Sequence, residues 1–386
     1  MDRLRAEGGA VPFRLYMQWA LHDPDHGAYG SGRLQVGPRG DFTTSPSLGS
    51  DFAALLAPQL AQWLEQQPVD QPLSLLEAGP GEGDLALHLA QELVQGWPAL
   101  RDRLVLQLIE PNAGMAERQR QRLQDCPLPC HWTSFAALEA NPVRGVLLAH
   151  EVLDALAVER ITWDGGVWRV QEVALQEAPS GQPSLQLRLG ETLPAEALGQ
   201  LEGLGLLQPG SQRPAGWTTE LHSELPAWFR AAGAALQSGV LLVVDYAHEA
   251  WRYYAPQRSN GTLMAYRQQQ ASDDPLLNPG EWDLTAHLCL DSLEQAAVVA
   301  GWESLGQRRQ GEALLALGLA ERLHALQHQA ASGLETLLAR REALLRFVDP
   351  HTLGDFRWAA FRRPTAESFP SAPGHGSLFL QDPPLS

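Results

Sequence analysis

A strand that runs into a glycine-rich turn and then into a helix is the feature that most constrains this chain. Residues 73–79 form a short apolar run that ends in glycine, and the sequence GPGEGD at 79–84 leads into the helical pattern of 84–94. Glycines permit positive φ and close approach of a ligand, and the N-terminus of the helix offers free N–H donors to an anionic group. The segment therefore predicts the first strand, turn and helix of an α/β nucleotide-binding domain.

The spacing of the glycines separates two cofactor classes. Gly79, Gly81 and Gly83 do not fit the G-x-G-x-x-G fingerprint of dinucleotide sites, because the third glycine comes one residue early. Together with Glu77 they form the E/D-x-G-x-G-x-G pattern of S-adenosylmethionine (SAM) sites. There are two alternatives. The glycine turn could have a purely structural role, or the protein could be a nicotinamide-dependent oxidoreductase, which the glycine spacing disfavours.

Two acidic residues at strand ends support a SAM site. The apolar run at 103–110 predicts a second strand that ends at Glu110, whose carboxylate offers two acceptor oxygens to the vicinal ribose hydroxyls. Glu77 ends the first strand and would attract the cationic amino and sulfonium groups of SAM by charge. The alternative for Glu110 is a solvated acid at the end of a strand.

The rest of the chain continues the alternation of strands and helices. Apolar runs at 145–150 and 239–246 predict buried parallel strands, and 112–123 predicts a helix capped by Asn112. This is the pattern of a doubly wound α/β domain with a mostly parallel sheet. Asp-Gly-Gly at 164–166, between two alternating runs, predicts an inserted antiparallel hairpin. The pattern suggests four segments along the chain. We expect a helical and loop segment over 1–70 that covers the cofactor site, followed by a core over 71–310 with the insertion at about 158–215. A helical segment with the last core strand should follow over 311–362, and a loop or tail over 363–386.

Glu151 and Asp154 follow the strand that ends at His150, at the sheet edge where ligands bind in open α/β folds. If the segment turns helically, the i,i+3 spacing places both carboxylates on one face, directed at the cofactor. The alternative is that Asp154 caps a helix and Glu151 is solvated. A zinc site of the H-E-x-x-H type lacks its second histidine here, and Cys126-x3-Cys130 has no second cysteine pair, so no metal is predicted.

Charge and cysteine content restrict the classes of partner and the cellular compartment that we expect. The 386 residues carry 28 basic and 45 acidic side chains, for a formal net charge of −17. This balance disfavours nucleic-acid phosphates and anionic membranes and suits a cationic partner. Three cysteines are too few for a disulfide scaffold, and no secretory signal or long apolar stretch is present. We therefore expect a cytoplasmic protein with no nucleic-acid partner and no membrane partner.

Taken in order, these motifs resemble the MidA family of SAM-dependent methyltransferases, which includes a mitochondrial assembly factor for respiratory complex I. The resemblance runs along most of the chain, through PFRLYMQWALHDPDHGAYG, GDFTTSP, LLEAGPGEGDL, LIEPN, HEVLDALAV, VVDYAH, GTLMAYRQQQASDDPLLNPGEWDLTAH and LGDFRWAAF. It implies a class I Rossmann-like methyltransferase core with SAM as the cofactor. It also implies that Glu77, Gly79, Gly81, Gly83 and Glu110 bind that cofactor.

The resemblance assigns roles to two further segments. The family's GDF-x-TSP loop matches Asp41 to Pro46, which implies that Asp41 and Ser45 lie near the cofactor. The family's Asn-Glu-x-x-Asp-Ala motif matches Glu151 and Asp154, the catalytic candidates. The mitochondrial members are protein arginine methyltransferases, so a protein with an exposed arginine is the implied substrate. The chain departs from the family pattern at several positions, including His150 where the family has Asn. The alternative is a non-catalytic SAM-binding assembly factor that binds a partner protein through the helices at 311–347.

Overall fold

The computed structural model describes residues 1–34, 37, 40–41, 43–177, 183–328, 333–364 and 376–383. The chain divides into two compact units, each built from segments that are far apart in the sequence. The first unit comprises Met1–Leu34, Asp154–Pro226 and Ala247–Gln295, and the second comprises Gln35–Leu153, Ala227–Tyr246 and Ala296–Ser386. Residues 1–34 thus group with the predicted insertion, and the rest of the expected N-terminal segment over 1–70 groups with the second unit.

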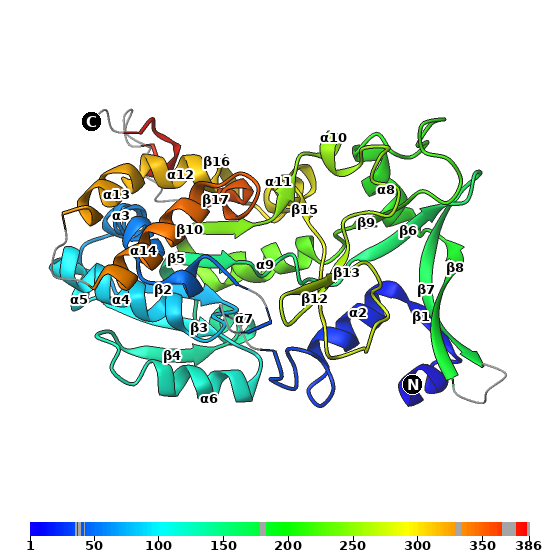
Figure 1. Ribbon diagram of the computed structural model, residues 1–386, viewed down its shortest axis with the longest axis horizontal. Coiled ribbons are helices and arrows are strands. Elements are labelled where there is room, and N and C mark those ends of the chain that lie inside the picture. Colours follow the sequence, from blue (N-terminus) through cyan, green and yellow to red (C-terminus); the bar gives the residue numbers. More distant parts are fainter. Residues whose placement is uncertain are drawn as a thin grey trace. The chain divides into compact units, whose positions relative to one another are not determined.

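The second unit is built on a seven-stranded mixed sheet with the strand order β16-β17-β10-β5-β2-β3-β4 (Figure 1). Its strands are β2 (Leu73–Ala78), β3 (Leu104–Ile109), β4 (Cys130–Thr133), β5 (Val143–His150), β10 (Leu236–Asp245), β16 (Glu303–Arg309) and β17 (Arg357–Arg363). β17 runs antiparallel to both of its neighbours, and the other pairings in the sheet are parallel. The chain leaves β2 in one direction towards β3 and β4 and returns on the other side as β5. The carboxyl ends of β2 and β5 therefore flank a topological switch point, where open α/β sheets bind ligands.

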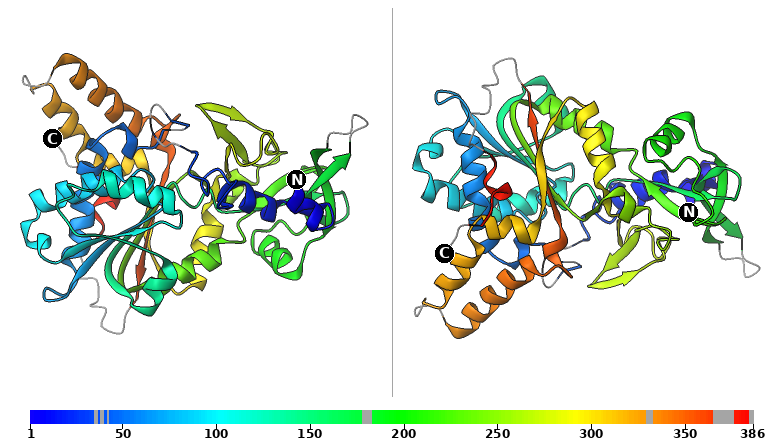
Figure 2. Two further views of the ribbon diagram at one scale, coloured as in Figure 1. Left: turned by 90° about the horizontal axis from the view of Figure 1, so that it is seen from below. Right: turned by 90° about the horizontal axis from the view of Figure 1, so that it is seen from above.

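Helices pack against this sheet and complete the core of the second unit. The helical elements of the unit are η1 (Pro46–Leu48), α3 (Asp51–Glu65), α4 (Asp84–Gly96), α5 (Pro98–Arg101), α6 (Ala113–Arg122), α7 (Phe135–Ala140), α12 (Gln310–Ala316), α13 (Leu319–Leu326), α14 (Leu334–Val348), η2 (Leu353–Asp355) and η3 (Leu378–Leu380). Leucines of α3, α4, α12 and α14 share one buried cluster with alternate residues of β2, β3, β5 and β10. Figure 2 shows α13 and α14 as an orange helical hairpin beside the sheet. This packing leaves the loops at the carboxyl ends of the strands to build a site.

The first unit contains the predicted antiparallel insertion. Its main sheet has the order β1-β7-β6-β9 with β8 paired to β7, and every pairing in that sheet is antiparallel. Its elements are α1 (Asp2–Ala6), β1 (Ala10–Pro12), α2 (Phe13–His22), β6 (Glu159–Trp163), β7 (Trp168–Glu177), β8 (Pro183–Thr192), α8 (Ala195–Gly203), β9 (Thr218–Leu221), β11 (Ala247–His248), α10 (Ala250–Tyr253), β12 (Met264–Arg267), β13 (Gln270–Ser272), β14 (Asp283–Thr285) and β15 (Leu288–Cys289). Two helices, α9 (Leu225–Ala235) and α11 (Leu290–Val299), contain points at which the chain passes from one unit to the other.

The α/β class and the predicted elements around the glycine turn are confirmed. Asn112 caps α6 as expected, because its side-chain oxygen accepts the backbone N–H of Met115 at 2.8 Å. The segment expected to be a loop or tail, 363–386, contributes a side chain to the core. Within the described part of that segment Phe379 is fully buried, and its ring packs edge-to-face on Trp63. A large apolar side chain gains more by entering the core than by staying in water.

Among the described residues, no helix combines the length and the apolar character that a membrane span requires.

Candidate functional site

The glycine turn between β2 and α4 has the backbone that its sequence predicts. Gly79, Gly81 and Gly83 have φ values of +59°, +53° and +87°, a region that residues with a Cβ rarely adopt. The N–H of Gly79 donates to the carbonyl of Ile109 at 3.1 Å, which joins the start of the turn to the end of β3. A Cβ added to Gly79 would lie 3.0 Å from Cγ2 of Val152, so the turn also packs closely against the segment that follows β5.

Glu77 lies near the end of β2 with its carboxylate buried. The residue is 6% exposed, and Oε2 has no hydrogen-bond partner among the described residues. Burial, followed by the nearby charge of Asp84, raises the pKa of Glu77 to about 8. A buried carboxylate without a partner is costly, and a cationic ligand group would relieve that cost.

Glu110 follows β3 and is held from two sides. Oε1 accepts the backbone N–H of Asn112 at 2.8 Å, and Oε2 accepts Nε2 of Gln119 at 3.0 Å. Burial raises the pKa of Glu110, although both of these hydrogen bonds oppose the shift. A carboxylate can accept about four hydrogen bonds, so each oxygen still has capacity for a ligand hydroxyl.

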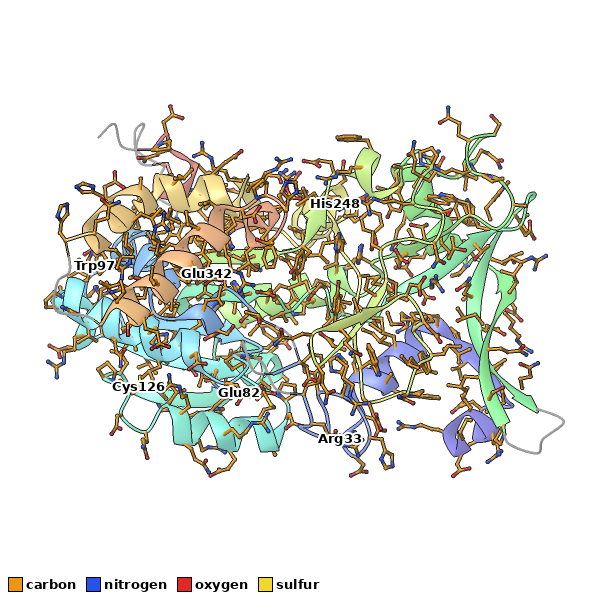
Figure 3. The ribbon with its side chains drawn as sticks, in the orientation of Figure 1. Arg33, Glu82, Trp97, Cys126, His248 and Glu342 are labelled. Carbon is orange, nitrogen blue, oxygen red and sulfur yellow. The ribbon has the colours of Figure 1, made fainter. Side chains whose placement is uncertain are left out.

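Gln119 and Trp132 join this site, and sequence reasoning did not identify either of them. Gln119 is fully buried in α6, and its Nε2 also donates to the carbonyl of Gly81 at 2.8 Å. Its Oε1 accepts the indole N–H of Trp132 in β4 at 2.9 Å. The local sequence offered little signal, because Gln119 and Gln121 both stand between arginines in a polar helix and only Gln119 is buried. The turn is held further by an ion pair between Glu82, labelled in Figure 3, and Arg118 at 3.2 Å.

The end of β5 carries a backbone outlier at the predicted acid. Glu151 has a φ of +53°, which is uncommon for a residue other than glycine, and its side chain is only 8% exposed. Its backbone N–H donates to the carbonyl of Val244 at 2.8 Å, which holds this conformation against β10. Strained backbone of this kind costs about 1–3 kcal/mol and clusters at functional sites.

His150, the departure from the family motif, is a neutral core residue. Burial lowers its pKa to about 3, and Nε2 has no hydrogen-bond partner among the described residues. Its ring packs edge-to-face on Phe52 with 5.2 Å between the ring centres. The 3.4 Å contact between Nδ1 of His150 and Oε1 of Glu151 is therefore not an ion pair at neutral pH.

Asp154 falls in the first unit, and the segment around it is not helical. Residues 151–158 form turns and bends, so the alternative in which Asp154 caps a helix is wrong, as is the shared helical face with Glu151. The left-handed backbone of Glu151 prevents a helix from starting there. Asp154 is 7% exposed, and burial raises its pKa to about 7. In its own unit Asp154 lies near Tyr266, whose pKa is raised by burial and then by the charge of Asp154.

The remaining residues to consider are the two predicted cofactor-loop residues and the acid at the end of β10. Ser45 is fully buried, and its hydroxyl accepts Nε2 of Gln310 at 3.0 Å. Asp41 is half-buried. Asp245, at the end of β10, accepts the backbone N–H of Leu153 at 3.0 Å, so this acid braces the loop that follows β5.

Metal-ligating residues do not gather in the part of the chain that the structure describes. No group of three or more His, Cys, Asp or Glu side chains there could hold a metal ion. Cys126, labelled in Figure 3, and Cys130 are free thiols, each half-buried, in and after the loop that follows α6.

Comparison with known proteins identifies the family of the chain. The sequence profile of a family described as "putative S-adenosyl-L-methionine-dependent methyltransferase" matches residues 55–308. A crystal structure from Burkholderia thailandensis of a protein bound to S-adenosyl-homocysteine is 26% identical, with a TM-score of 0.82 over 99% of this chain and 94% of that one. A native crystal structure from the same organism is also 26% identical, with a TM-score of 0.80 over 99% of this chain and 93% of that one.

Curated relatives carry a more specific name. "Protein arginine methyltransferase NDUFAF7 homolog, mitochondrial" from Drosophila melanogaster is 28% identical over 88% of this chain and 80% of its own length. The human protein arginine methyltransferase NDUFAF7, mitochondrial, is 25% identical over 82% of this chain and 72% of its own length. The predicted cytoplasmic location is wrong by this comparison, because these relatives are named as mitochondrial proteins. A low cysteine content, on which that prediction was partly based, does not separate the cytoplasm from other reducing compartments.

The family profile covers most of the chain and includes the glycine turn, both strand-end acids and the segment after β5. The resemblance inferred from the motifs is therefore confirmed, and the chain belongs to the family of S-adenosyl-L-methionine-dependent methyltransferases.

Proposed function

We propose that this enzyme transfers the methyl group of SAM to an arginine side chain of a protein substrate, and that Glu151 engages the acceptor. The observation that carries the proposal is a buried carboxylate in a left-handed backbone conformation directly after β5. The names of the curated relatives support arginine as the acceptor. The formal net charge of −17 suits a basic partner.

We also propose that the second unit is a class I Rossmann-like methyltransferase core with a mostly parallel sheet. Its support is the order β16-β17-β10-β5-β2-β3-β4, in which β17 alone runs against its neighbours. In this arrangement the carboxyl ends of β2, β3 and β5 lie along one edge of the sheet. One edge can then present both the cofactor-binding acids and the acceptor-binding acid.

The residues along this edge fit the proposed cofactor. Glu77 would pair with the cationic methionine part, since its buried oxygen has no other partner among the described residues. Glu110 would accept the ribose hydroxyls, because its two oxygens are held apart and each keeps acceptor capacity. Gly79, Gly81 and Gly83 would let the ligand approach the backbone. Asp41 and Ser45 remain proposed cofactor-loop residues, for which slower amide exchange on addition of S-adenosyl-homocysteine would be the supporting result.

The bound cofactor supplies an electrophilic methyl carbon on a sulfonium centre. Arginine reaches the site charged, because its pKa exceeds about 12. The Glu151 carboxylate would clamp the guanidinium, orient one nitrogen, and stabilise the positive charge during transfer. Asp154, with a pKa of about 7, can accept a proton near neutral pH, so we propose it as an assisting acid–base group.

Methyl transfer from tritiated SAM to proteins of a cell lysate, followed by amino-acid analysis for methylarginines, tests the proposal. Glu151→Gln keeps the shape and removes the charge, so methylarginine formation should fall by about a hundredfold or more while SAM affinity stays nearly unchanged. Glu139→Gln is the matched control, since Glu139 is an exposed acid on α7, and it should leave the rate unchanged. Asp154→Asn should give a smaller loss than Glu151→Gln.

Three outcomes would contradict the proposal. If Glu151→Gln forms methylarginine at the wild-type rate, Glu151 does not engage the acceptor. If label appears on a residue other than arginine, the acceptor class is wrong. If the wild-type protein binds SAM and labels no protein, the non-catalytic assembly factor becomes the better account of this chain.

A further inference from the structure

We propose that Gln119 is a positioning residue that holds the glycine turn and the ribose-binding acid in one fixed geometry. The inference rests on the proposed cofactor role of Glu110. Gln119 touches both halves of the candidate site, although it lies nine residues from Glu110 and 38 from Gly81 in the sequence. Its Nε2 donates to the carbonyl of Gly81 at 2.8 Å and to Oε2 of Glu110 at 3.0 Å.

The orientation of the Gln119 amide is fixed by a third contact. The indole of Trp132 can only donate a hydrogen bond, and its Nε1 lies 2.9 Å from Oε1 of Gln119. The amide oxygen must therefore face Trp132, and the NH2 group is directed at the two acceptors. A flipped amide would set a donor against the indole N–H and an acceptor against a carboxylate and a carbonyl. Because Gln119 is fully buried, water cannot replace these partners.

These bonds determine how Glu110 presents its oxygens. Gln119 holds one oxygen, and the backbone N–H of Asn112 holds the other at 2.8 Å. With both oxygens anchored, the carboxylate keeps one orientation before the ligand arrives. A pre-oriented acceptor loses less entropy when it binds a vicinal diol than a rotating one does. Gln119 would thus contribute to cofactor affinity without touching the cofactor.

Calorimetry with two ligands separates this role from a general structural one. S-adenosyl-homocysteine and its 2′,3′-dideoxy analogue differ only in the ribose hydroxyls that Glu110 would accept. For the wild type, the analogue should bind at least about tenfold more weakly, as expected for hydrogen bonds to a charged group. Gln119→Leu removes the donors at similar volume, so the ratio of the two dissociation constants should fall to less than about threefold. Gln121→Leu, an exposed site on the same helix, should keep the wild-type ratio.

A second variant keeps the test valid if Gln119→Leu does not fold. Gln119→Met keeps the length of the side chain but cannot donate either hydrogen bond, so the ratio should fall as it does for leucine. Melting temperatures of all variants are measured in parallel, because lost stability by itself does not change a ratio of two affinities. The wild-type ratio in both Gln119 variants would overturn the positioning role.

Glu110→Ala distinguishes failure of this inference from failure of the cofactor assignment. If Glu110→Ala abolishes discrimination between the ligands and the Gln119 variants do not, only the positioning role is wrong. If Glu110→Ala retains the wild-type ratio, the ribose role of Glu110 is wrong and the role of Gln119 falls with it.

Discussion

Glu77→Gln should make the ligand-free protein more stable while weakening cofactor binding. The pKa of Glu77 is about 8 in the folded protein, compared with an ordinary value of 4.5. At neutral pH the folded state therefore holds a proton that the unfolded state has released, so the free energy of unfolding falls as pH rises from about 4.5 to about 8. At about 1.36 kcal/mol per pH unit, this loss reaches about 3 kcal/mol at pH 7. A glutamine at position 77 does not titrate and avoids the loss.

Urea denaturation across this pH range measures the effect. The stability advantage of Glu77→Gln should be close to zero at the acidic end and grow to about 1–3 kcal/mol at pH 7, while Glu139→Gln on the surface should follow the wild type. A cationic ligand should also displace the proton from Glu77, so wild-type binding of S-adenosyl-homocysteine at pH 7 should release close to one proton. Calorimetry in buffers of different ionisation enthalpy detects that release. A variant no more stable than wild type at any pH, or binding without proton release, would refute the reasoning.

Three further substitutions test other parts of the structure through denaturant unfolding. Gly79→Ala should lower the free energy of unfolding by about 1–2 kcal/mol, because the backbone has a φ of +59° and the new Cβ would lie 3.0 Å from Val152. Adding Val152→Ala should restore part of that loss. Wild-type stability in Gly79→Ala would show that the position is not strained. Asp51→Ala should cost about 2 kcal/mol near neutral pH by removing ion pairs from Arg322 and Arg340 at 2.5 and 2.7 Å. Burial would raise the pKa of Asp51, but the two arginines outweigh it and lower that pKa, so the wild-type advantage should decline once pH falls below about 3.8 and be lost below the folded-state pKa. An advantage independent of pH would contradict this origin. Phe379→Ala should cost about 3 kcal/mol, and an unchanged midpoint would show that this segment does not contribute to the core.

The sequence by itself determined the glycine turn, the strands on either side of it, and the acids Glu77 and Glu110. Each of these signals is local, because a strand, a turn and a helix follow one another within about twenty residues. The carboxyl ends of parallel strands meet along one edge of a sheet, so strand-end acids in the sequence become neighbours of the turn in space. The motif order was also sufficient to identify the methyltransferase family, which the family profile confirmed.

Only the tertiary structure decided how the side chains of the site are partnered. Gln119 meets Gly81 and Trp132 because α6 packs back between the turn and β4, which hydrophobic periodicity does not specify. The positive φ of Glu151 is held by a backbone hydrogen bond to Val244, 93 residues later in the chain. Glutamate normally avoids this region of φ, so the residue type alone does not predict it. Periodicity reports which face of an element is buried, whereas the partner of a buried polar group depends on the register of distant segments.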